Sequence, residues 1–324
     1  MTKTRIGVIG LGWIADSYML PVLTRFDDVT VSGICDVDSN RLAATGKKFN
    51  IEKKYSDYRD LLGNGDVDGV MVAVHPTHTA KISRACLDRG IPTYLEKPPG
   101  ISPEETQGIC SSARENNAKA MVAFNRRYWP LVKQVQKIIT DKGALTQFSF
   151  EFFKSRDTDP SSRETAFDPL VGTIVHGVDL LRFILGDPEK VMSDYRMIDS
   201  TVNNSFLALF KFPGGVSGTM NTSWTAGTRL ERYSFHGPGY SVFMESPDRA
   251  WLYFSGEKEE ILPATESVYK IPGDSLPGYN AGFPQEIRAF IDWISSGQEP
   301  ATTIEDGLKT MVLLGKIREA GINK

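Results

Sequence analysis

The start of the chain carries the feature that most constrains its fold, a glycine motif between an apolar run and an amphipathic stretch. Residues 5–9 are followed by Gly10-Leu-Gly-Trp-Ile-Ala15, a Gly-x-Gly-x-x-Ala motif. Gly10 permits a tight turn, Gly12 lets backbone N–H groups approach a pyrophosphate, and Ala15 lets the helix pack closely on the strand. A strand, this turn and a helix in succession predict a dinucleotide-binding Rossmann unit.

An acidic residue follows the next apolar run, where this type of unit places the carboxylate that accepts the ribose hydroxyls. Asp36 comes directly after the run 29–35. A carboxylate there repels the 2′-phosphate of NADP, which favours NAD. Arg41 follows in the next helix and could reach that phosphate, so NADP remains the alternative. We predict that this half of the cofactor is bound by Gly10, Gly12, Trp13, Ile14, Asp36 and Arg41.

Short apolar runs alternate with amphipathic stretches through residues 4–124. Strands that alternate with helices predict a doubly wound parallel sheet covered on both faces. The predicted strands are Arg5–Ile9, Val29–Cys35, Val67–Val74, Thr93–Leu95 and Ala120–Phe124, and the predicted helices lie near 13–26, 39–49, 78–89 and 104–117.

From about residue 144 the strands follow one another with few helices between them, and Pro-Gly turns separate several of them. This pattern predicts a second, α+β domain with an open and mostly antiparallel sheet. We therefore expect domains at 1–124 and 125–324, with His236 at a turn. The predicted strands are Gln147–Phe153, Phe206–Phe212, Val216–Ser223, Arg232–Phe235, Val242–Glu245 and Ala250–Phe254, and the helices lie near 173–185, 283–296 and 303–320.

The composition excludes several classes of protein. The 324 residues carry a formal net charge of -3, which argues against a nucleic-acid or anionic-membrane surface. Four histidines and three cysteines are too few for a Cys-rich zinc module or a disulfide scaffold. Neither a secretory signal nor an apolar stretch of spanning length is seen, so we expect a soluble, cytoplasmic protein with reduced thiols and no metal site.

A second motif makes the chain resemble a known family. Tyr94-Leu-Glu-Lys97-Pro-Pro99, at the end of a predicted strand, is similar to the Glu-Lys-Pro motif of the glucose–fructose oxidoreductase / inositol dehydrogenase / MocA (Gfo/Idh/MocA) family. The resemblance extends over essentially the whole chain, through Asn125-Arg-Arg-Tyr128, His176-Gly-Val-Asp179 and residues 305–308. The junction and residues 154–156 are most similar to the virulence-factor-like (MviM-type) branch.

The resemblance implies a function as well as a fold. It implies an active site between the two domains, where a nicotinamide cofactor exchanges hydride with a sugar, polyol or related alcohol. It also implies a homodimer or homotetramer, because open sheets of this kind usually cover their outer face. Two alternatives stay open within the family: a cofactor-binding sensor without catalysis, and a redox-neutral, NAD-dependent glycosidase.

Lys97 is the first predicted catalytic residue. Ligands of parallel sheets bind outside the carboxyl ends of the strands, and Lys97 follows such an end. Pro98 and Pro99 restrict the backbone after it. Its ammonium group could stabilise an alkoxide or relay its proton, whereas the alternative is a solvated surface lysine.

His176 is the second predicted catalytic residue, and Asp179 on the same helical face could fix its tautomer. A purely structural His–Asp pair is the alternative. Polyol dehydrogenases of the family commonly place an aspartate where this chain has Gly172, and Asp168 and Asp179 are candidate substitutes. Gly172 favours the sensor, whereas the intact Glu96-Lys97-Pro98 motif and His176 weigh against it. The predicted substrate contacts are Lys97, Arg156, Asp179 and His176.

Further residues are predicted to contact the cofactor near its nicotinamide. They follow three predicted strands in the first domain or lie at the junction. For Arg127, an interdomain salt bridge is the alternative. A metal ion bound by His75 and His78 has little support. The predicted contacts are Val74, Pro76, His78, Glu96, Lys97, Asn125 and Arg127.

Overall fold

The computed structural model describes residues 3–64, 66–155 and 168–321. The chain forms two compact units, Met1–Asn125 with Thr265–Lys309 and Arg126–Ala264 with Thr310–Lys324. This division differs from the expected one, because residues 265–309 return to the first unit. Helix α9 (Phe283–Ser296) shows the reason: Tyr94 donates a 2.8 Å hydrogen bond to buried Glu286, and its ring packs on Phe290.

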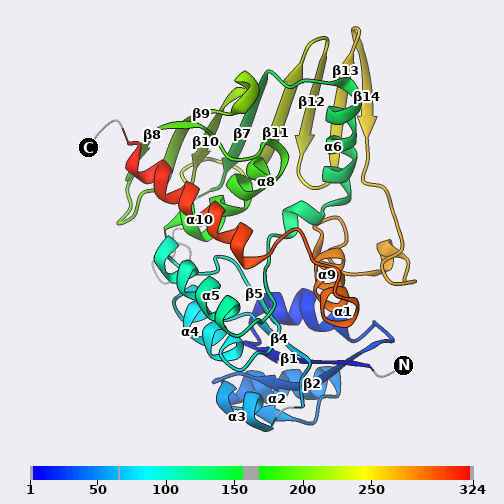
Figure 1. Ribbon diagram of the computed structural model, residues 1–324. Helices are drawn as coiled ribbons and strands as arrows, with labels where there is room; N and C mark the ends of the chain where they lie inside the picture. The colour runs from blue at the N-terminus through cyan, green and yellow to red at the C-terminus, as the bar shows by residue number, and fades with distance from the viewer. Residues whose placement is uncertain (1–2, 65, 156–167, 322–324) are drawn as a thin grey trace. The chain divides into compact units, whose positions relative to one another are not determined.

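The first unit is built on a six-stranded sheet in the order β3-β2-β1-β4-β5-β6. All of its strand pairs are parallel, and helices cover both faces (Figure 1). This confirms the predicted Rossmann architecture. Its elements up to residue 122 are β1 (Thr4–Ile9), η1 (Ala15–Met19), α1 (Leu20–Leu23), β2 (Val29–Cys35), α2 (Ser39–Phe49), β3 (Lys54–Tyr55), α3 (Tyr58–Asn64), β4 (Gly69–Val72), α4 (Pro76–Leu87), β5 (Thr93–Leu95), α5 (Pro103–Glu115) and β6 (Ala120–Val122).

Local signals explain why these elements begin where they do. Strand β4 is buried along its whole length, as expected for a central strand covered on both faces. Helix α5 begins after Ser102, whose Oγ accepts a 3.3 Å hydrogen bond from the N–H of Glu105. Glu105 in turn accepts a 3.0 Å hydrogen bond from the N–H of Ile101. Helix α2 is capped by Asp38 in the same way.

The second unit is built on an eight-stranded sheet in the order β14-β13-β12-β11-β7-β10-β9-β8. Among the described strands of this second sheet, only the β7–β10 pair is parallel, which confirms a mostly antiparallel sheet. The divisions between the units fall within η2 (Asn125–Tyr128) and within α10 (Ile304–Glu319), and η5 (Gly273–Ser275) precedes α9 in the first unit. The other elements of the second unit are α6 (Pro130–Lys142), β7 (Gln147–Phe153), η3 (Leu170–Ile174), α8 (Val175–Leu185), β8 (Lys190–Arg196), β9 (Ser205–Lys211), η4 (Pro213–Gly215), β10 (Ser217–Ser223), β11 (Leu230–Gly237), β12 (Tyr240–Glu245), β13 (Arg249–Phe254) and β14 (Glu257–Ile261).

The inner face of the second sheet packs directly on α8. Phe148, Phe150 and Phe152 alternate along β7 and are buried. A Cβ atom on Gly177 would lie only 1.9 Å from Cζ of Phe150, so only glycine permits this approach of helix and strand. The residues of α8 that follow are thereby held against the sheet.

Several elements of the second unit do not match the sequence pattern. Helix α6 and the two edge strands, β8 and β14, were not expected. Strand β14 is almost entirely charged and exposed, which protects a sheet edge from further pairing but removes the alternation that predicts a strand. The expectation of a turn at His236 was wrong: it lies in β11, with Nδ1 2.8 Å from Oγ of Ser241. No helix among the described residues is both long and apolar enough to cross a membrane.

Candidate active site

The glycine motif forms a tight turn between β1 and η1. Gly10 has φ +88°, and its N–H donates a 2.8 Å hydrogen bond to the carbonyl of Cys35. A Cβ atom at Gly10 would lie 2.4 Å from the carbonyl oxygen of Ala73. At Gly12 a Cβ atom would have no neighbour within 4 Å, so the backbone there is open to close approach. The first N–H groups of the following helix have no helical acceptor and favour an anion.

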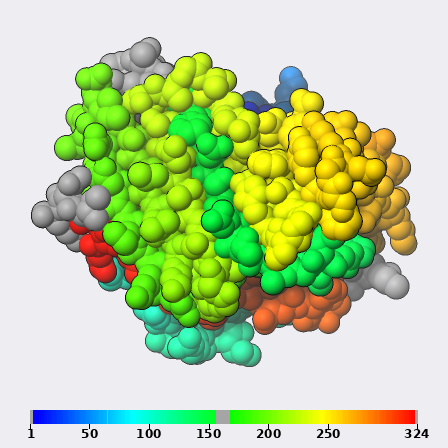
Figure 2. Space-filling view, turned by 90° about the horizontal axis from the view of Figure 1, so that it is seen from above, coloured from blue at the N-terminus to red at the C-terminus, as the bar shows by residue number. Residues whose placement is uncertain are grey.

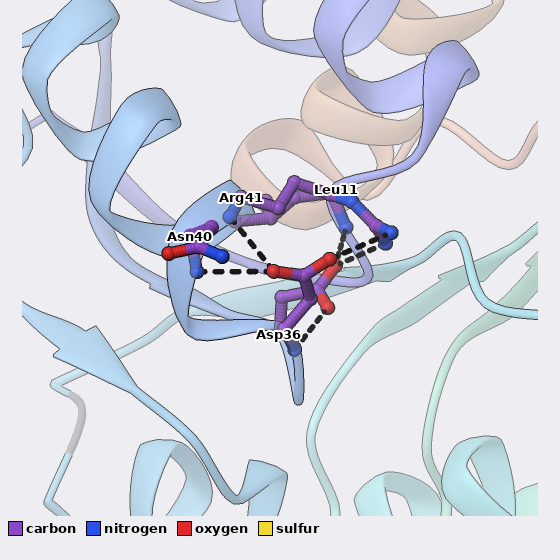
Figure 3. A network of polar contacts seen from close by, with 5 residues as sticks. Leu11, Asp36, Asn40 and Arg41 are labelled. Atoms are coloured by element: carbon purple, nitrogen blue, oxygen red, sulfur yellow. Dashed lines mark hydrogen bonds and ion pairs between the residues drawn. The ribbon is translucent and has the colours of Figure 1, made fainter.

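Asp36 joins this turn to the end of β2 (Figure 3). Its carboxylate is buried and accepts hydrogen bonds from the N–H of Leu11 at 2.8 Å and of Asp38 at 2.9 Å. The Arg41 guanidinium lies 3.1 Å from Asp36 and 3.2 Å from Asp38. Backbone hydrogen bonding from Arg41 is the main cause that lowers the pKa of Asp38. One arginine therefore faces two carboxylates beside the turn.

The segment after β4 begins α4. His75 is the N-cap, and its Nδ1 lies 2.9 Å from Oγ1 of Thr77. Pro76 is the first residue of the helix, and His78 donates its N–H to the carbonyl of His75 at 2.8 Å. Val74 lies against the glycine turn, since a Cβ atom at Gly10 would be 2.9 Å from its Cγ1.

Glu96 and Lys97 follow β5. The N–H of Glu96 donates a 2.9 Å hydrogen bond to Val72, which continues the pairing with β4. Burial raises the pKa of the Glu96 carboxyl to about 7, although the neighbouring Lys97 charge opposes the shift. Lys97 itself is partly exposed and is joined to Pro98 by a cis peptide bond.

The parallel order of the sheet brings these groups to one edge. The turn, Asp36, the start of α4, and Glu96 with Lys97 follow β1, β2, β4 and β5, whose carboxyl ends meet at the same edge. Asn125 follows β6 at this edge and donates a 2.9 Å hydrogen bond to the carbonyl of Ala281. The predicted cofactor residues of the first unit are thus placed together.

In the second unit, Arg127 and Asp179 form a buried ion pair. The guanidinium donates to both carboxylate oxygens, at 2.7 and 2.5 Å, and both side chains are less than 5% exposed. Thr310 donates a third hydrogen bond to the carboxylate at 2.8 Å and accepts one from Arg182 at 2.9 Å. The structure therefore pairs two residues for which the sequence suggested separate contacts.

His176 is also buried on α8, next to the glycine that contacts Phe150. Gly172 donates its N–H to the carbonyl of Asp168 at 2.8 Å, as part of the turn that begins η3. The Asp168 carboxylate accepts a hydrogen bond from Leu170 at 2.8 Å and pairs with Arg318. Asp168 is thus engaged in helix capping, and the predicted contact Arg156 lies outside the described residues.

Sequence reasoning missed a second buried cluster. Arg126 donates to Glu231 at 2.5 and 2.7 Å, and the Tyr233 hydroxyl donates to the same carboxylate at 2.8 Å. Burial, followed by the Glu231 charge, raises the pKa of Tyr233 well above its usual value. Glu231 and Tyr233 occupy alternate, inward-pointing positions of β11. A carboxylate in the inward alternation of a strand is the feature of the sequence that could have indicated a buried ion pair here. Within the described ranges, no group of three or more His, Cys, Asp or Glu side chains is placed to hold a metal ion.

Comparison with known proteins gives two adjacent family matches. A model described as "Oxidoreductase family, NAD-binding Rossmann fold" matches residues 4–124, and a "GFO/IDH/MocA C-terminal domain" model matches residues 132–242. The chain is similar to myo-inositol 2-dehydrogenase of Thermotoga maritima, with 24% identity across 96% of this chain and 94% of that protein. It is also similar to trans-1,2-dihydrobenzene-1,2-diol dehydrogenase of Sus scrofa, with 26% identity across 98% and 96%.

Solved structures share the fold over nearly the whole chain. A levoglucosan dehydrogenase in complex with NADH and levoglucosan aligns with a TM-score of 0.88 at 20% identity, covering 99% of this chain and 98% of that one. An Agrobacterium radiobacter oxidoreductase in complex with NAD+, L-tartaric acid and magnesium aligns with a TM-score of 0.86 at 20% identity, covering 99% and 97%.

Proposed function

Because the chain belongs to the Gfo/Idh/MocA oxidoreductase family, we propose that it is an NAD(P)-dependent dehydrogenase that acts on a CH–OH group of a sugar, a polyol or a related alcohol, or on the matching carbonyl. One observation carries the proposal. The glycine turn, a buried carboxylate and Lys97 lie at one edge of a parallel sheet, where such sheets bind their ligands. The names of the similar proteins support the substrate class.

The residues present fit a dinucleotide. The open backbone at Gly12 admits a pyrophosphate, and Trp13 and Ile14 follow it at the helix start. Asp36 lies beside the turn with a carboxylate that can accept ribose hydroxyls, which favours NAD over NADP, and Arg41 covers it. Toward the nicotinamide we propose contacts from Val74, Pro76, His78, Glu96, Lys97 and Asn125.

A structural role explains Arg127 better than a contact with the cofactor does. Its guanidinium is committed to Asp179 by two hydrogen bonds and is almost fully buried. This supports an ion pair within the second unit over the predicted cofactor contact and over the alternative of an interdomain salt bridge. It also weakens the proposal that Asp179 binds substrate.

Lys97 is the proposed acid/base residue. A nicotinamide ring held at this edge would supply the hydride acceptor or donor for the substrate carbon. In the oxidation direction the Lys97 amine would take the proton of the substrate hydroxyl, and in the reduction direction the Lys97 ammonium would return a proton to the developing alkoxide. Glu96 precedes it in the chain and is buried, and this burial raises the pKa of its carboxyl group to about 7. We propose His176 as a further proton-transfer group and substrate contact, because an imidazole can exchange a proton near neutral pH. We propose Arg156 as a substrate contact because a cation after a sheet strand suits a carboxylate or a phosphorylated sugar, and a basic strand end in water is the alternative.

A screen for reduced cofactor tests the function. The protein is incubated with NAD+ or NADP+ and a panel of polyols, sugars and sugar acids, and absorbance is followed at 340 nm. We expect reduction with at least one substrate and a preference for NAD+. Cofactor binding without turnover of any substrate would favour the sensor, and product release without net NADH would favour the redox-neutral glycosidase.

We also propose that the chain forms a homodimer or homotetramer through the outer face of the second sheet. Figure 2 shows this face, with green β7 between yellow-green strands on one side and yellow strands on the other. Met192 on β8 is 56% exposed and pairs with Leu209 on β9, which is 50% exposed, and Leu207 beside it is 52% exposed. Exposed apolar side chains gathered on a sheet face favour association.

Sedimentation velocity tests this association. We expect the wild type to sediment as a dimer or tetramer and the Leu207→Lys/Leu209→Lys variant to be monomeric with an unchanged circular dichroism spectrum. A wild type that is monomeric at all concentrations would contradict the proposal.

We also propose a cytoplasmic location, which is supported by three free, buried cysteines, Cys35, Cys86 and Cys110. Cell fractionation tests this location.

A further inference from the structure

Trp13 is the most exposed aromatic side chain among the described residues, at 68%. It directly follows Gly12, in the turn whose backbone is proposed to bind the pyrophosphate. A large indole is rarely left in water when neighbouring apolar surface is available to cover it. Its exposure at a proposed ligand site therefore needs an explanation.

The indole is oriented by two further rings. Trp13 meets Tyr18 edge-to-face, with centroids 5.2 Å apart and an interplanar angle of 88°. Tyr18 stacks on Phe283 at 4.1 Å with an angle of only 6°. Gly278 closes the stack, because a Cβ atom there would lie 2.7 Å from the Tyr18 ring and 2.8 Å from Phe283. The Tyr18 ring is thus fixed, and it holds the Trp13 indole at a right angle to itself while most of the indole surface stays exposed.

This series of rings belongs to the edge of the sheet that carries Lys97. Trp13 follows β1, and Ala281, two residues before Phe283, accepts the hydrogen bond of Asn125 after β6. Strands β4 and β5 lie between β1 and β6 in the sheet, and Lys97 follows β5. The segment that holds the rings therefore extends across the carboxyl edge of the first unit, from the glycine turn to the end of β6.

We propose that the exposed indole surface of Trp13 is the platform on which the C–H face of the substrate ring or chain packs. The inference rests on the proposed function. The backbone of this turn serves the pyrophosphate, which leaves the side chain for a second ligand. Sugars and polyols present polarised C–H groups on one side and hydroxyls on the other, and an indole face attracts the former through its negative quadrupole. Lys97 at the same edge is suited to the hydroxyl side.

Acrylamide quenching of tryptophan fluorescence tests the platform without requiring turnover. Levoglucosan and myo-inositol are titrated into the protein saturated with NAD+. We expect at least one of them to reduce quenching in the wild type, and neither to change quenching in Trp13→Phe. If neither sugar protects the wild type, or if NAD+ alone protects Trp13 fully, the platform proposal is overturned whether or not the protein is a dehydrogenase.

Kinetics on the substrate found by the cofactor screen provide the second test. Trp13→Ala should raise KM about tenfold while the Kd of NADH stays within about twofold, and Trp13→Phe should recover most of the loss. Tyr18→Ala, which removes the positioning ring, should raise KM by less than Trp13→Ala does. Tyr18→Phe, which keeps the ring, should leave KM unchanged. Trp251→Ala, on β13 of the other unit, is the matched control and should change neither constant. An unchanged KM in Trp13→Ala, or a loss of NADH affinity in its place, contradicts the proposal.

Discussion

The Arg41 guanidinium and the N–H of Leu11 share one oxygen of Asp36, Oδ2, at 3.1 and 2.8 Å. The residue that would accept the ribose hydroxyls is therefore already held by the glycine turn and covered by a cation. Removing the carboxylate would release that cation toward whatever occupies the site. We therefore expect the pair to control which dinucleotide binds.

Asp36→Ser should shift the cofactor preference toward NADP. Loss of charge-assisted hydrogen bonds to the ribose should raise the KM for NAD+ by about 10- to 100-fold. Arg41 becomes available to a 2′-phosphate, so the KM for NADP+ should fall. Steady-state kinetics with both cofactors check this, and adding Arg41→Gln should cancel the gain. If Asp36→Ser binds both cofactors as the wild type does, the assigned role of Asp36 is wrong.

Gly10 and Gly12 should respond differently to alanine. Gly10→Ala places a Cβ atom 2.4 Å from a backbone carbonyl at a φ of +88°, so the folded protein should be strongly destabilised. Gly12→Ala adds a Cβ atom in open space, so its thermal unfolding should match the wild type while NADH affinity falls, because the methyl group occupies the approach path of the pyrophosphate. Calorimetry and a fluorescence titration with NADH separate the two effects. If Gly12→Ala binds NADH as tightly as the wild type does, the glycine turn is not part of the cofactor site.

Asp179→Asn should be severely destabilising. The substitution leaves the Arg127 guanidinium buried without its counter-charge, which typically costs about 3–5 kcal/mol. Asp141→Asn is the matched control, because its ion pair with Lys137 is exposed and should contribute less than about 1 kcal/mol. Urea unfolding measures both. A loss of activity in Asp179→Asn with unchanged stability would instead support a direct role of Asp179 at the substrate.

Ionisation of the buried Glu96 carboxyl group should lower the free energy of unfolding as the pH rises. Its pKa is raised from 4.5 to about 7 in the folded protein, so the folded state binds the proton more tightly than the unfolded state. This contribution is complete below pH 4.5 and is lost as the pH rises through 7. Glu96→Gln, which cannot ionise, should therefore gain stability relative to the wild type between pH 5 and 8, by up to about 3 kcal/mol.

Urea unfolding of both proteins across this pH range measures the difference. Glu52→Gln, at an exposed position, is the control and should follow the wild-type curve. Parallel curves for the wild type and Glu96→Gln would show that Glu96 ionises at its ordinary pKa.

Local sequence signals predicted the first unit well. The glycine turn, the capping residues of α5 and the position of Asp36 depend on neighbours in the chain, and the structure has all three. Long-range contacts were not predictable in this way. The amphipathic pattern of 283–296 predicted a helix but not the sheet against which it packs. The partners of Arg127 and Arg126 lie 52 and 105 residues away, and nothing near either arginine indicates them.

Lys97→Met tests the central claim most directly, because it removes the ammonium group and keeps a side chain of similar length. On the substrate found by the screen, kcat is measured at 340 nm with NAD+, and the Kd of NADH is measured in parallel. A proton-transfer role predicts a fall in kcat of at least about 100-fold with the Kd of NADH nearly unchanged. A Lys97→Met protein that turns over at the wild-type rate would contradict the proposed catalytic role of this edge of the sheet.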